Sequence, residues 1–253
     1  LCMRGFREFL RKETTPEERE KLGVGDLDTF DYGTHAKKQG APVGDAFGRW
    51  KGGRLKQLFV QFQAEATVAF HQRTRKAIDA YAGRRVPISC NNGCRTWGKI
   101  QMQFDWAFGE LSYGHATAVQ IHNAMQEATR RGRLQVVTMP KKGDQKNPEE
   151  WLQRTRRTIA MATASGGHCM VPWDTFMPSN APRYFGTPEQ YADLYGFIRA
   201  NGEWLDRYEY AGAFGKGMKH KLYNDEPPIR LKAHAEVHAV VRARPGQRDA
   251  PVV

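Results

Sequence analysis

Two apolar stretches with a helical segment between them decide the fold class of this sequence: FDWAFGEL at residues 104–111 and LQVVTMP at residues 134–140. Both are rich in the aromatic and β-branched residues that favour strands. Between them, apolar residues from His115 to about Arg131 follow the spacing of a helix. A strand, a helix and a strand in this order predict a parallel βαβ unit, so we expect an α/β protein.

The same alternation continues on both sides of this unit. VPISCNN at residues 86–92 and GHCMVPWD at residues 167–174 are strand-like. A helix is expected to begin near Pro148, a first-turn proline, and a capping box at residues 187–190 opens a last helix that ends near Asn201. The sequence therefore predicts four consecutive parallel strands whose carboxyl ends share one cleft. The last residues of these strands are Asn92, Glu110, Pro140 and Asp174.

The ends of these strands favour a barrel over a nucleotide-binding sheet. None of them is followed by GxGxxG or GxxxxGK[ST], which excludes dinucleotide and P-loop sites. The strands end instead in polar or aromatic residues, at the positions that face the substrate in a (β/α)8 TIM barrel. Because such a barrel needs eight strands, we expect the chain to cover mainly its C-terminal half, with the first strands outside the sequence.

Several longer ranges complete the predicted organisation. Residues 1–222 are assigned to the barrel domain and residues 223–253 to a post-barrel segment that leads into a β domain, because β-branched residues alternate between residues 233 and 244. Apolar spacing from Leu55 onward predicts one long helix that ends before Gly83. Residues 23–53 are rich in glycine and charge, so we expect an irregular excursion that forms a wall of the site.

Charge and composition narrow the choice of partners. The 253 residues carry 39 Lys and Arg against 27 Asp and Glu, a formal net charge of +12. Such a protein attracts polyanions, but the basic residues are scattered and accompany no nucleic-acid-binding motif, which disfavours nucleic acid and favours solvated helix faces. An acidic or sulfated polysaccharide stays open as a partner. No apolar run of about 18 residues is present, so no membrane contact is expected. A homo-oligomer is compatible with the sequence.

The cysteine pattern bears on metals and cofactors. The chain has four cysteines without a CxxC pair: Cys2, Cys90, Cys94 and Cys169. Neither a structural zinc site nor a redox dithiol is therefore indicated, and we expect mostly buried, unpaired thiols. No metal and no cofactor is assigned.

CMRGFREFL at residues 2–10 fits the pattern C-x-x-x-F-R-x-[WYF]-L. It resembles the segment after the fourth strand of family 42 glycoside hydrolases, the β-galactosidase type, and of related uncharacterised barrel hydrolases. The order of the long helix and the later strands is also similar, over about residues 2–195. The resemblance implies a TIM barrel, a retaining mechanism with two carboxylates, and a secreted or periplasmic location.

The resemblance also implies where the functional residues lie. The family's acid/base Glu would precede Leu1, outside the sequence. At the end of the seventh strand, where the family has its nucleophilic Glu, residues 137–141 read VTMPK and contain none. Cys2 matches the last cysteine of a zinc cluster found in part of the family, but its partner cysteines are not visible in the sequence.

Three carboxylates are candidate catalytic residues: Glu110, Asp174 and Asp105. Glu110 ends an apolar strand after Gly109, where an ionised carboxylate is either functional or held in a structural salt bridge. Asp174 follows Trp173 at the end of the last strand, where barrel hydrolases place an aromatic platform under a sugar ring. Asp105 lies on the opposite face of an ideal strand from Glu110, unless a bulge near Gly109 changes the alternation.

Substrate binding is assigned to polar and aromatic residues at or near the strand ends: Trp173, Asn91, Asn92, Tyr113, His115, Lys141 and His168. The asparagines suit sugar hydroxyls, but Asn-Asn-Gly is also ordinary turn chemistry. The histidines suit either acid/base or structural roles. Lys141 suits an anionic sugar substituent or a solvated loop. If the substrate is anionic, Lys141 or Arg183 should border the cleft.

These features predict a glycoside hydrolase that acts on a poly- or oligosaccharide, with an anionic substrate as one option. Two alternatives stay open. A non-catalytic carbohydrate-binding barrel would keep Trp173 and the asparagines but lack the carboxylate pair. A polyanion-binding protein would gather its positive charge on one face, and its binding would weaken steeply with added salt.

Overall fold

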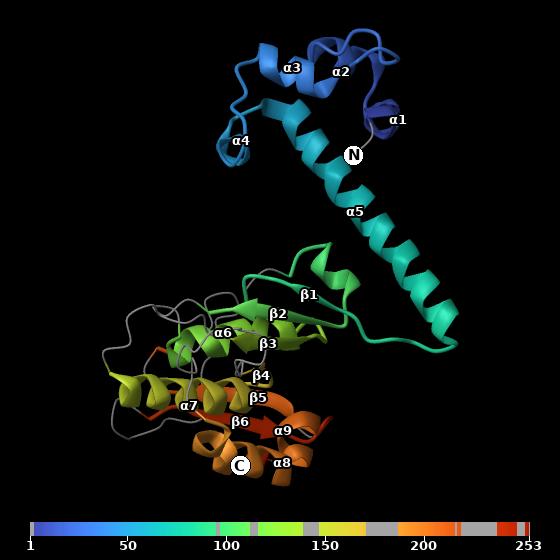
Figure 1. Ribbon diagram of the computed structural model, residues 1–253. Coiled ribbons are helices and arrows are strands. Elements are labelled where there is room, and N and C mark those ends of the chain that lie inside the picture. Colours follow the sequence, from blue (N-terminus) through green and yellow to red (C-terminus); the bar gives the residue numbers. More distant parts are fainter. Residues whose placement is uncertain are drawn as a thin grey trace. The chain divides into compact units, whose positions relative to one another are not determined.

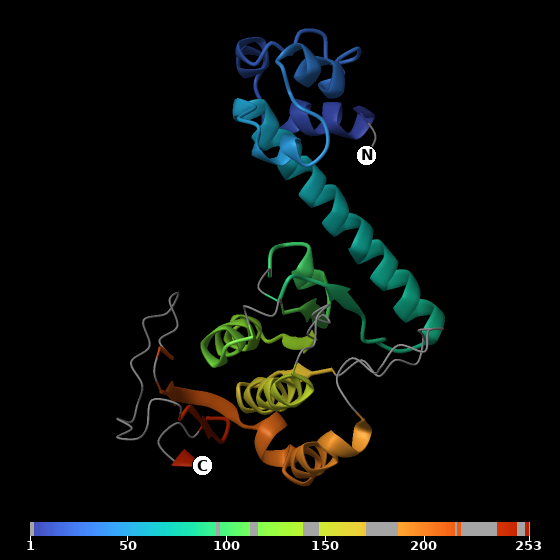
Figure 2. The same ribbon diagram turned by 60° about the vertical axis from the view of Figure 1, so that its left-hand side comes forward.

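The structure, a computed structural model, describes residues 3–94, 97–111, 116–138, 147–170, 187–215, 217–218, 237–246 and 251–252. The chain divides into two compact units, Leu1–Val86 and Pro87–Val253, which Figures 1 and 2 show in two views. None of the described helices is both long enough and apolar enough to cross a membrane. All of the predicted strands fall in the second unit.

In its described residues, the first unit contains five helices and no strand. They are α1 (Met3–Glu13), α2 (Pro16–Lys21), α3 (Tyr32–Lys38), α4 (Ala46–Arg49) and α5 (Gly53–Ala82). Local sequence sets two helix ends. The Thr15 hydroxyl accepts a hydrogen bond from the Glu18 N–H (3.2 Å) at the start of α2, and Gly83 adopts a left-handed φ of 63° after α5. The predicted long helix, with its end before Gly83, is confirmed.

Aromatic side chains from α1, α3 and α5 form the core of this unit. Tyr32 stacks on Phe59 with ring centroids 4.1 Å apart, and Phe6 meets Phe59 edge-on at 5.1 Å. The prediction of an irregular excursion at residues 23–53 is wrong, because this segment carries α3 and α4 and buries Phe30 and Tyr32 in the core. The segment is rich in glycine and charged residues, which favours an irregular loop. The buried surface of the segment comes instead from a few large aromatic residues.

A four-stranded parallel sheet contains the predicted strands (Figure 1). They are β1 (Ser89–Asn91), β2 (Trp106–Glu110), β3 (Leu134–Thr138) and β4 (His168–Cys169), in the spatial order β1-β2-β3-β4. The short helix η1 (Gln101–Gln103) follows β1, α6 (Ala118–Thr129) follows β2, and α7 (Pro148–Ala164) follows β3. The prediction of four consecutive parallel strands is therefore confirmed, although each strand is shorter than its apolar stretch.

Each strand of this sheet lies beside the strand that precedes it in the sequence. The order does not reverse, as it does in a doubly wound sheet, and it matches the order along half of a (β/α)8 barrel. Closure into a TIM barrel stays a prediction.

The two long helices of this unit begin at side-chain caps. The Thr117 hydroxyl accepts a hydrogen bond from the Gln120 N–H (3.3 Å) at the start of α6. The Asn147 side chain accepts one from the Glu150 N–H (3.1 Å) at the start of α7, and a proline follows Asn147. Such caps satisfy N–H groups that lack partners inside the helix. Both predicted helices are confirmed.

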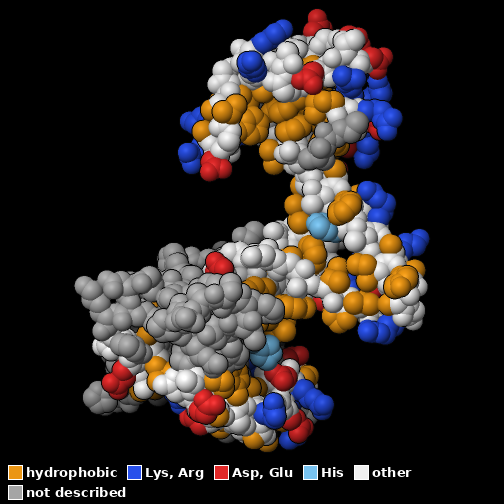
Figure 3. All heavy atoms as spheres, in the orientation of Figure 1, with side chains coloured by type: hydrophobic (Ala, Val, Ile, Leu, Met, Phe, Trp, Pro, Cys, Tyr) orange, Lys and Arg blue, Asp and Glu red, His pale blue; other side chains and the backbone are white. Residues whose placement is uncertain are grey.

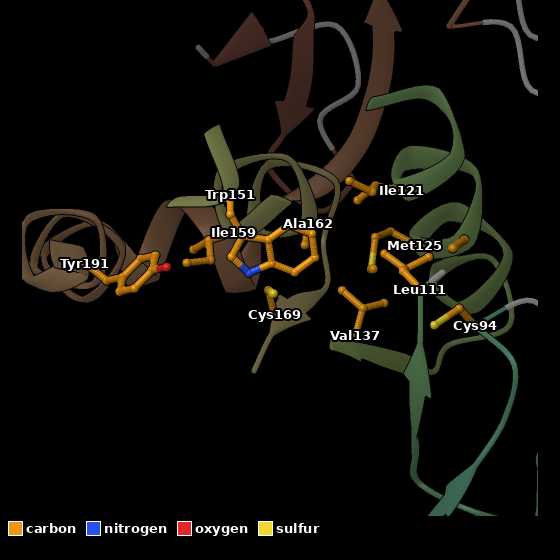
Figure 4. Packing of buried hydrophobic residues seen from close by; sticks show 11 residues of the cluster. Cys94, Leu111, Ile121, Met125, Val137, Trp151, Ile159, Ala162, Cys169 and Tyr191 are labelled. Atoms are coloured by element: carbon orange, nitrogen blue, oxygen red, sulfur yellow. The ribbon is translucent and has the colours of Figure 1, made fainter. Parts of the chain in front are cut away.

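The core of the second unit lies between the sheet and these helices. Val137 and Cys169 belong to one buried cluster with Met125 of α6 and Ile159 of α7 (Figure 4). Burial raises the pKa of the Cys169 thiol to about 12, so this side chain behaves as an uncharged apolar group. The three cysteines within the described residues are unpaired, as predicted. Cys94 and Cys169 are buried, and Cys90 is half-buried.

Three helical elements and a small antiparallel sheet follow β4. They are η3 (Pro188–Tyr191), α8 (Ala192–Ala200), α9 (Gly202–Arg207), β5 (Glu209–Phe214), β6 (Ala239–Ala243) and β7 (Pro251–Val252). The sheet has the order β5-β6-β7, and β6 confirms the strand expected between residues 233 and 244. The predicted capping box is present, since the Thr187 N–H donates to the Gln190 side chain (2.8 Å). The predicted domain boundary at residue 222 lies outside the described residues and stays a prediction.

The buried Arg242 joins β6 to the end of α7. Its guanidinium donates hydrogen bonds to the carbonyls of Thr163 (3.1 Å), Ala164 (2.9 Å) and Tyr208 (3.0 Å). The last carbonyls of a helix lack partners within the helix and carry partial negative charge, so a cation is favourable there. Burial lowers the pKa of Arg242 from its ordinary value. The antiparallel sheet is thereby tied to the helix layer of the parallel sheet.

Candidate functional site

The register of the parallel sheet determines which side chains share a face. Asn91 pairs with Phe108, Phe108 with Val136, and Val136 with His168. Paired residues on neighbouring strands point to the same face, because the strands keep their pleat in phase. This face is opposite to the one on which Val137 packs against the helices.

Glu110 and Thr138 lie on the same face, closer to the carboxyl ends of the strands. They pair with each other in the register, each two residues beyond Phe108 or Val136. The resulting surface, which we call the strand-end face, consists of Asn91, Phe108, Glu110, Val136, Thr138 and His168. In parallel α/β folds, ligands bind at the carboxyl ends of the strands. This face therefore holds the candidate site.

Glu110 is exposed at the end of β2. Within the described part of the chain, its carboxylate makes neither an ion pair nor a hydrogen bond. The alternative of a structural salt bridge, which the sequence left open, is therefore not supported. A solvated carboxylate at a strand end can accept hydrogen bonds from a ligand or exchange a proton with it.

Thr138 is the neighbour of Glu110 on β3 and is only 6% exposed. Its Oγ1 atom is buried and has no hydrogen-bond partner in the described structure. The sequence did not single out this residue, because the apolar run continues to Pro140 and Lys141 is the polar residue that follows it. The signal was a hydroxyl residue directly after Val136 and Val137, at the end of the strand.

Asn92 is buried on the other face, in a structural arrangement. Its Nδ2 donates to Gln135 Oε1 (3.0 Å), and Gln135 Nε2 donates back to Asn92 Oδ1 (3.0 Å). The Cys94 N–H also donates to Asn92 Oδ1 (3.2 Å). The turn after β1 passes so close to Gly109 that a Cβ there would lie 2.3 Å from the Asn92 carbonyl oxygen. These contacts favour the turn interpretation of Asn92 over sugar binding.

Asp105 lies before β2, at the end of the sheet opposite to Glu110. Its side chain accepts a hydrogen bond from the Ile88 N–H (2.9 Å), and its own N–H donates to the Ile88 carbonyl (2.9 Å). The length of β2 separates Asp105 from Glu110. The structure therefore does not bring these two candidate carboxylates together.

The remaining candidates divide into two groups. Asn91 is exposed at the end of β1, and His168 is half-buried at the start of β4, on the strand-end face with Glu110. The others lie outside the described residues: Asp174, Trp173, Tyr113, His115, Lys141 and Arg183. Within the described ranges, no three His, Cys, Asp or Glu side chains are grouped so that they could hold a metal ion.

Basic side chains are spread over the described surface. Figure 3 shows Lys and Arg interspersed with Asp and Glu on the visible face of the first unit. Surface ion pairs join separate segments: Arg11 with Asp28 (3.0 Å), Arg54 with Glu18 (3.4 Å) and Arg156 with Asp193 (2.6 Å). Such pairing favours solvated helix faces over a single polyanion-binding patch.

The described residues thus define a parallel α/β unit with a solvated carboxylate and a buried hydroxyl side by side at its strand ends. Comparison with known proteins finds distant similarity to α-agarases. The chain is 22% identical over 242 residues to the α-agarase of Thalassotalea agarivorans and 22% identical over 239 residues to that of Alteromonas agarilytica. Each alignment covers 88% of this chain but 16% of the relative, so the chain spans about a sixth of the length of these curated relatives. No known family model matches the chain. No solved structure matches it.

Proposed function

We propose that this chain is part of a glycoside hydrolase that acts on a polysaccharide at the carboxyl ends of β1 to β4. The observation that carries the proposal is the similarity to two α-agarases over 88% of the chain. The unpaired Glu110 carboxylate at a strand end gives this similarity a chemical counterpart. Agarose is accordingly the first substrate to test.

Glycoside hydrolysis needs two carboxyl groups on either side of the scissile bond, one as acid and one as nucleophile or base. We assign one of these roles to Glu110. Asp174, predicted at the end of the fourth strand, is the candidate partner within the sequence, and a carboxylate from further polypeptide is the alternative. A separation of about 5–5.5 Å between the two groups would give retention, and about 6.5–9.5 Å would give inversion.

The same proposal includes the barrel fold, the class of substrate and a role for His168. A closed TIM barrel agrees with the order β1-β2-β3-β4, and the family 42 resemblance agrees with hydrolysis of a galactose-containing polymer. An anionic substrate would be attracted electrostatically by the net charge of +12. His168, on the same face as Glu110, is a candidate for binding sugar hydroxyls.

One observation favours a second candidate function, a non-catalytic carbohydrate-binding unit. β3 ends in Thr138, and no carboxylate follows it through Lys141, where the family resemblance places a nucleophile. A site with only one carboxylate would bind a sugar chain without cleaving it.

Incubation of the 253-residue chain with agarose and with a sulfated galactan such as carrageenan tests these proposals. New reducing ends measure hydrolysis, and retardation in gels that contain each polymer measures binding. Hydrolysis of either polymer supports the enzyme. Binding without new reducing ends would favour the non-catalytic unit, and a chain that neither binds nor cleaves would contradict both. Comparison at 50 and 500 mM salt separates an anionic from a neutral substrate.

A further inference from the structure

The Thr138 hydroxyl lacks the hydrogen bond that two buried threonines of α7 make. The Thr155 hydroxyl donates to the Trp151 carbonyl (3.0 Å), and the Thr158 hydroxyl donates to the Arg154 carbonyl (3.0 Å). A helix offers such a carbonyl four residues earlier, but a strand does not. The Thr138 hydroxyl has no hydrogen-bond partner in the described structure although the residue is only 6% exposed.

An unpaired buried hydroxyl opposes folding, because it loses its bonds to water and gains none in return. Valine has almost the same shape, favours strands as strongly, and would remove this cost. Stability alone therefore does not explain a threonine at this position. Unpaired polar groups of this kind call for a separate account, such as a ligand contact.

The position of Thr138 indicates what this ligand contact is. Thr138 is the register partner of Glu110, and neighbouring strands lie about 4.8 Å apart. Both side chains belong to the strand-end face, above the apolar Phe108 and Val136. A hydroxyl with one donor and two acceptor sites matches a sugar hydroxyl, which also donates and accepts. The β-branched side chain has few rotamers, so the hydroxyl is held in place by a rigid strand.

We propose that Thr138 is a substrate-binding residue whose hydroxyl bonds to a sugar hydroxyl beside the bond that Glu110 attacks or protonates. This inference rests on the proposed function and names a residue that the sequence did not single out. In this arrangement a bound sugar hydroxyl lies against the Thr138 Oγ1 atom. The hydroxyl then gains the partner that it lacks in the described structure.

Three variants of the 253-residue chain test this inference: Thr138→Val, Thr138→Ser and the matched control Thr155→Val. Thr138→Val should unfold at a temperature equal to or above that of the wild type, because no hydrogen bond is lost. It should lower kcat/KM on agarose oligosaccharides about tenfold, the loss expected for one neutral hydrogen bond to the substrate. Thr138→Ser keeps the hydroxyl and should restore kcat/KM to within about threefold of the wild type.

Thr155→Val should behave in the opposite way, with a lower unfolding temperature and unchanged kcat/KM, because its hydroxyl is already bonded within α7. If Thr138→Val lost stability as Thr155→Val does, the hydroxyl would have a structural partner and the inference would be wrong. Unchanged kcat/KM in Thr138→Val, with an active wild type, would overturn this inference alone. A wild-type chain that neither binds nor cleaves the oligosaccharides would overturn the proposed function together with it.

Discussion

The two faces of the β1–β4 sheet differ in whether their polar side chains have hydrogen-bond partners. On the helix-facing side, the amides of Asn92 and Gln135 are buried and satisfy each other. On the strand-end face, the Glu110 carboxylate is solvated and the Thr138 hydroxyl is buried without a partner. Folding selects for paired polar groups, since an unpaired buried group costs free energy. The contrast assigns stability to one face and ligand contact to the other.

Removing the charge of Glu110 should have the largest effect. Glu110→Gln keeps the size and hydrogen-bonding capacity of the side chain, but it can neither attack nor transfer a proton. We expect kcat on the true substrate to fall by about 10³-fold or more, about 4 kcal/mol in the activation barrier, with an unchanged unfolding temperature. Measurement of reducing ends, with Glu149→Gln on the exposed first turn of α7 as the control, checks this. Near-normal turnover in Glu110→Gln would leave the catalytic role to other residues.

A side chain at Gly109 should damage the helix-facing side. The Cβ of Gly109→Ala would lie 2.3 Å from the Asn92 carbonyl oxygen and 2.6 Å from the Cys94 nitrogen, and both are backbone atoms that cannot rotate away. We expect a loss of about 3 kcal/mol in the free energy of unfolding, measured by urea denaturation. The control Gly93→Ala lies in the same turn with nothing within 4 Å of its Cβ, and it should change stability by less than about 0.5 kcal/mol. Equal effects of the two changes would contradict the close approach at Gly109.

Breaking the amide pair should have a smaller effect on the same face. Gln135→Leu removes the side chain that bonds both polar atoms of the Asn92 amide, and we expect a cost of about 2 kcal/mol in the free energy of unfolding. The double variant Asn92→Leu with Gln135→Leu should cost less than the sum of the single changes, by about 1 kcal/mol. Additive costs in urea denaturation would show that the two amides do not depend on each other.

The smallest expected effect concerns an exposed ion pair outside both faces. The Arg156 guanidinium donates two hydrogen bonds to Asp193 (2.8 and 2.6 Å) and lowers the pKa of that carboxyl from 3.8 to about 2. A carboxyl with a lowered pKa in the folded state stabilises the fold above its unfolded pKa of 3.8 and loses this contribution as the pH falls toward 2.

Asp193→Asn should therefore unfold at a slightly lower temperature than the wild type at pH 6, and the gap should narrow between pH 4 and pH 3. The gap should also shrink in about 0.5 M salt, because the pair is exposed and screened. Thermal scans of the wild type and of Asp193→Asn across this pH range measure the gap. A gap that stayed constant down to pH 3 would contradict the lowered pKa of Asp193.

Local sequence was sufficient to predict those helix ends and strands that depend on only a few neighbouring residues. The helix that ends at Gly83, the cap at Asn147 and the β-branched run of β3 could all be predicted, because each depends on neighbours along the chain. The segment at residues 23–53 could not, since Phe30 and Tyr32 are apolar residues without helical or strand periodicity. Their burial depends on partners supplied by α1 and α5.

The candidate site was predicted in part, and for the same reason. A carboxylate at the end of an apolar strand is visible in the sequence, so Glu110 was named as a candidate residue. The separate roles of Asn92 and Asn91 were not visible, because a strand presents adjacent residues to opposite faces and only the register tells which face is buried. Asp105 was expected on the opposite face of an ideal strand from Glu110, and its hydrogen bond with Ile88 places it at the other end of the sheet as well.

The order of residues along the chain was enough to predict the class of the second unit, in which apolar strands alternate with capped helices and the parallel strands follow chain order. Periodicity and caps act over one or two turns, so the order of residues is enough to specify them. Tertiary packing was needed to bring Asn92 to Gln135, 43 residues away, and Arg242 to Ala164, 78 residues away. It also placed Thr138 beside Glu110, because strand register is set by the packing of whole faces rather than by any one residue.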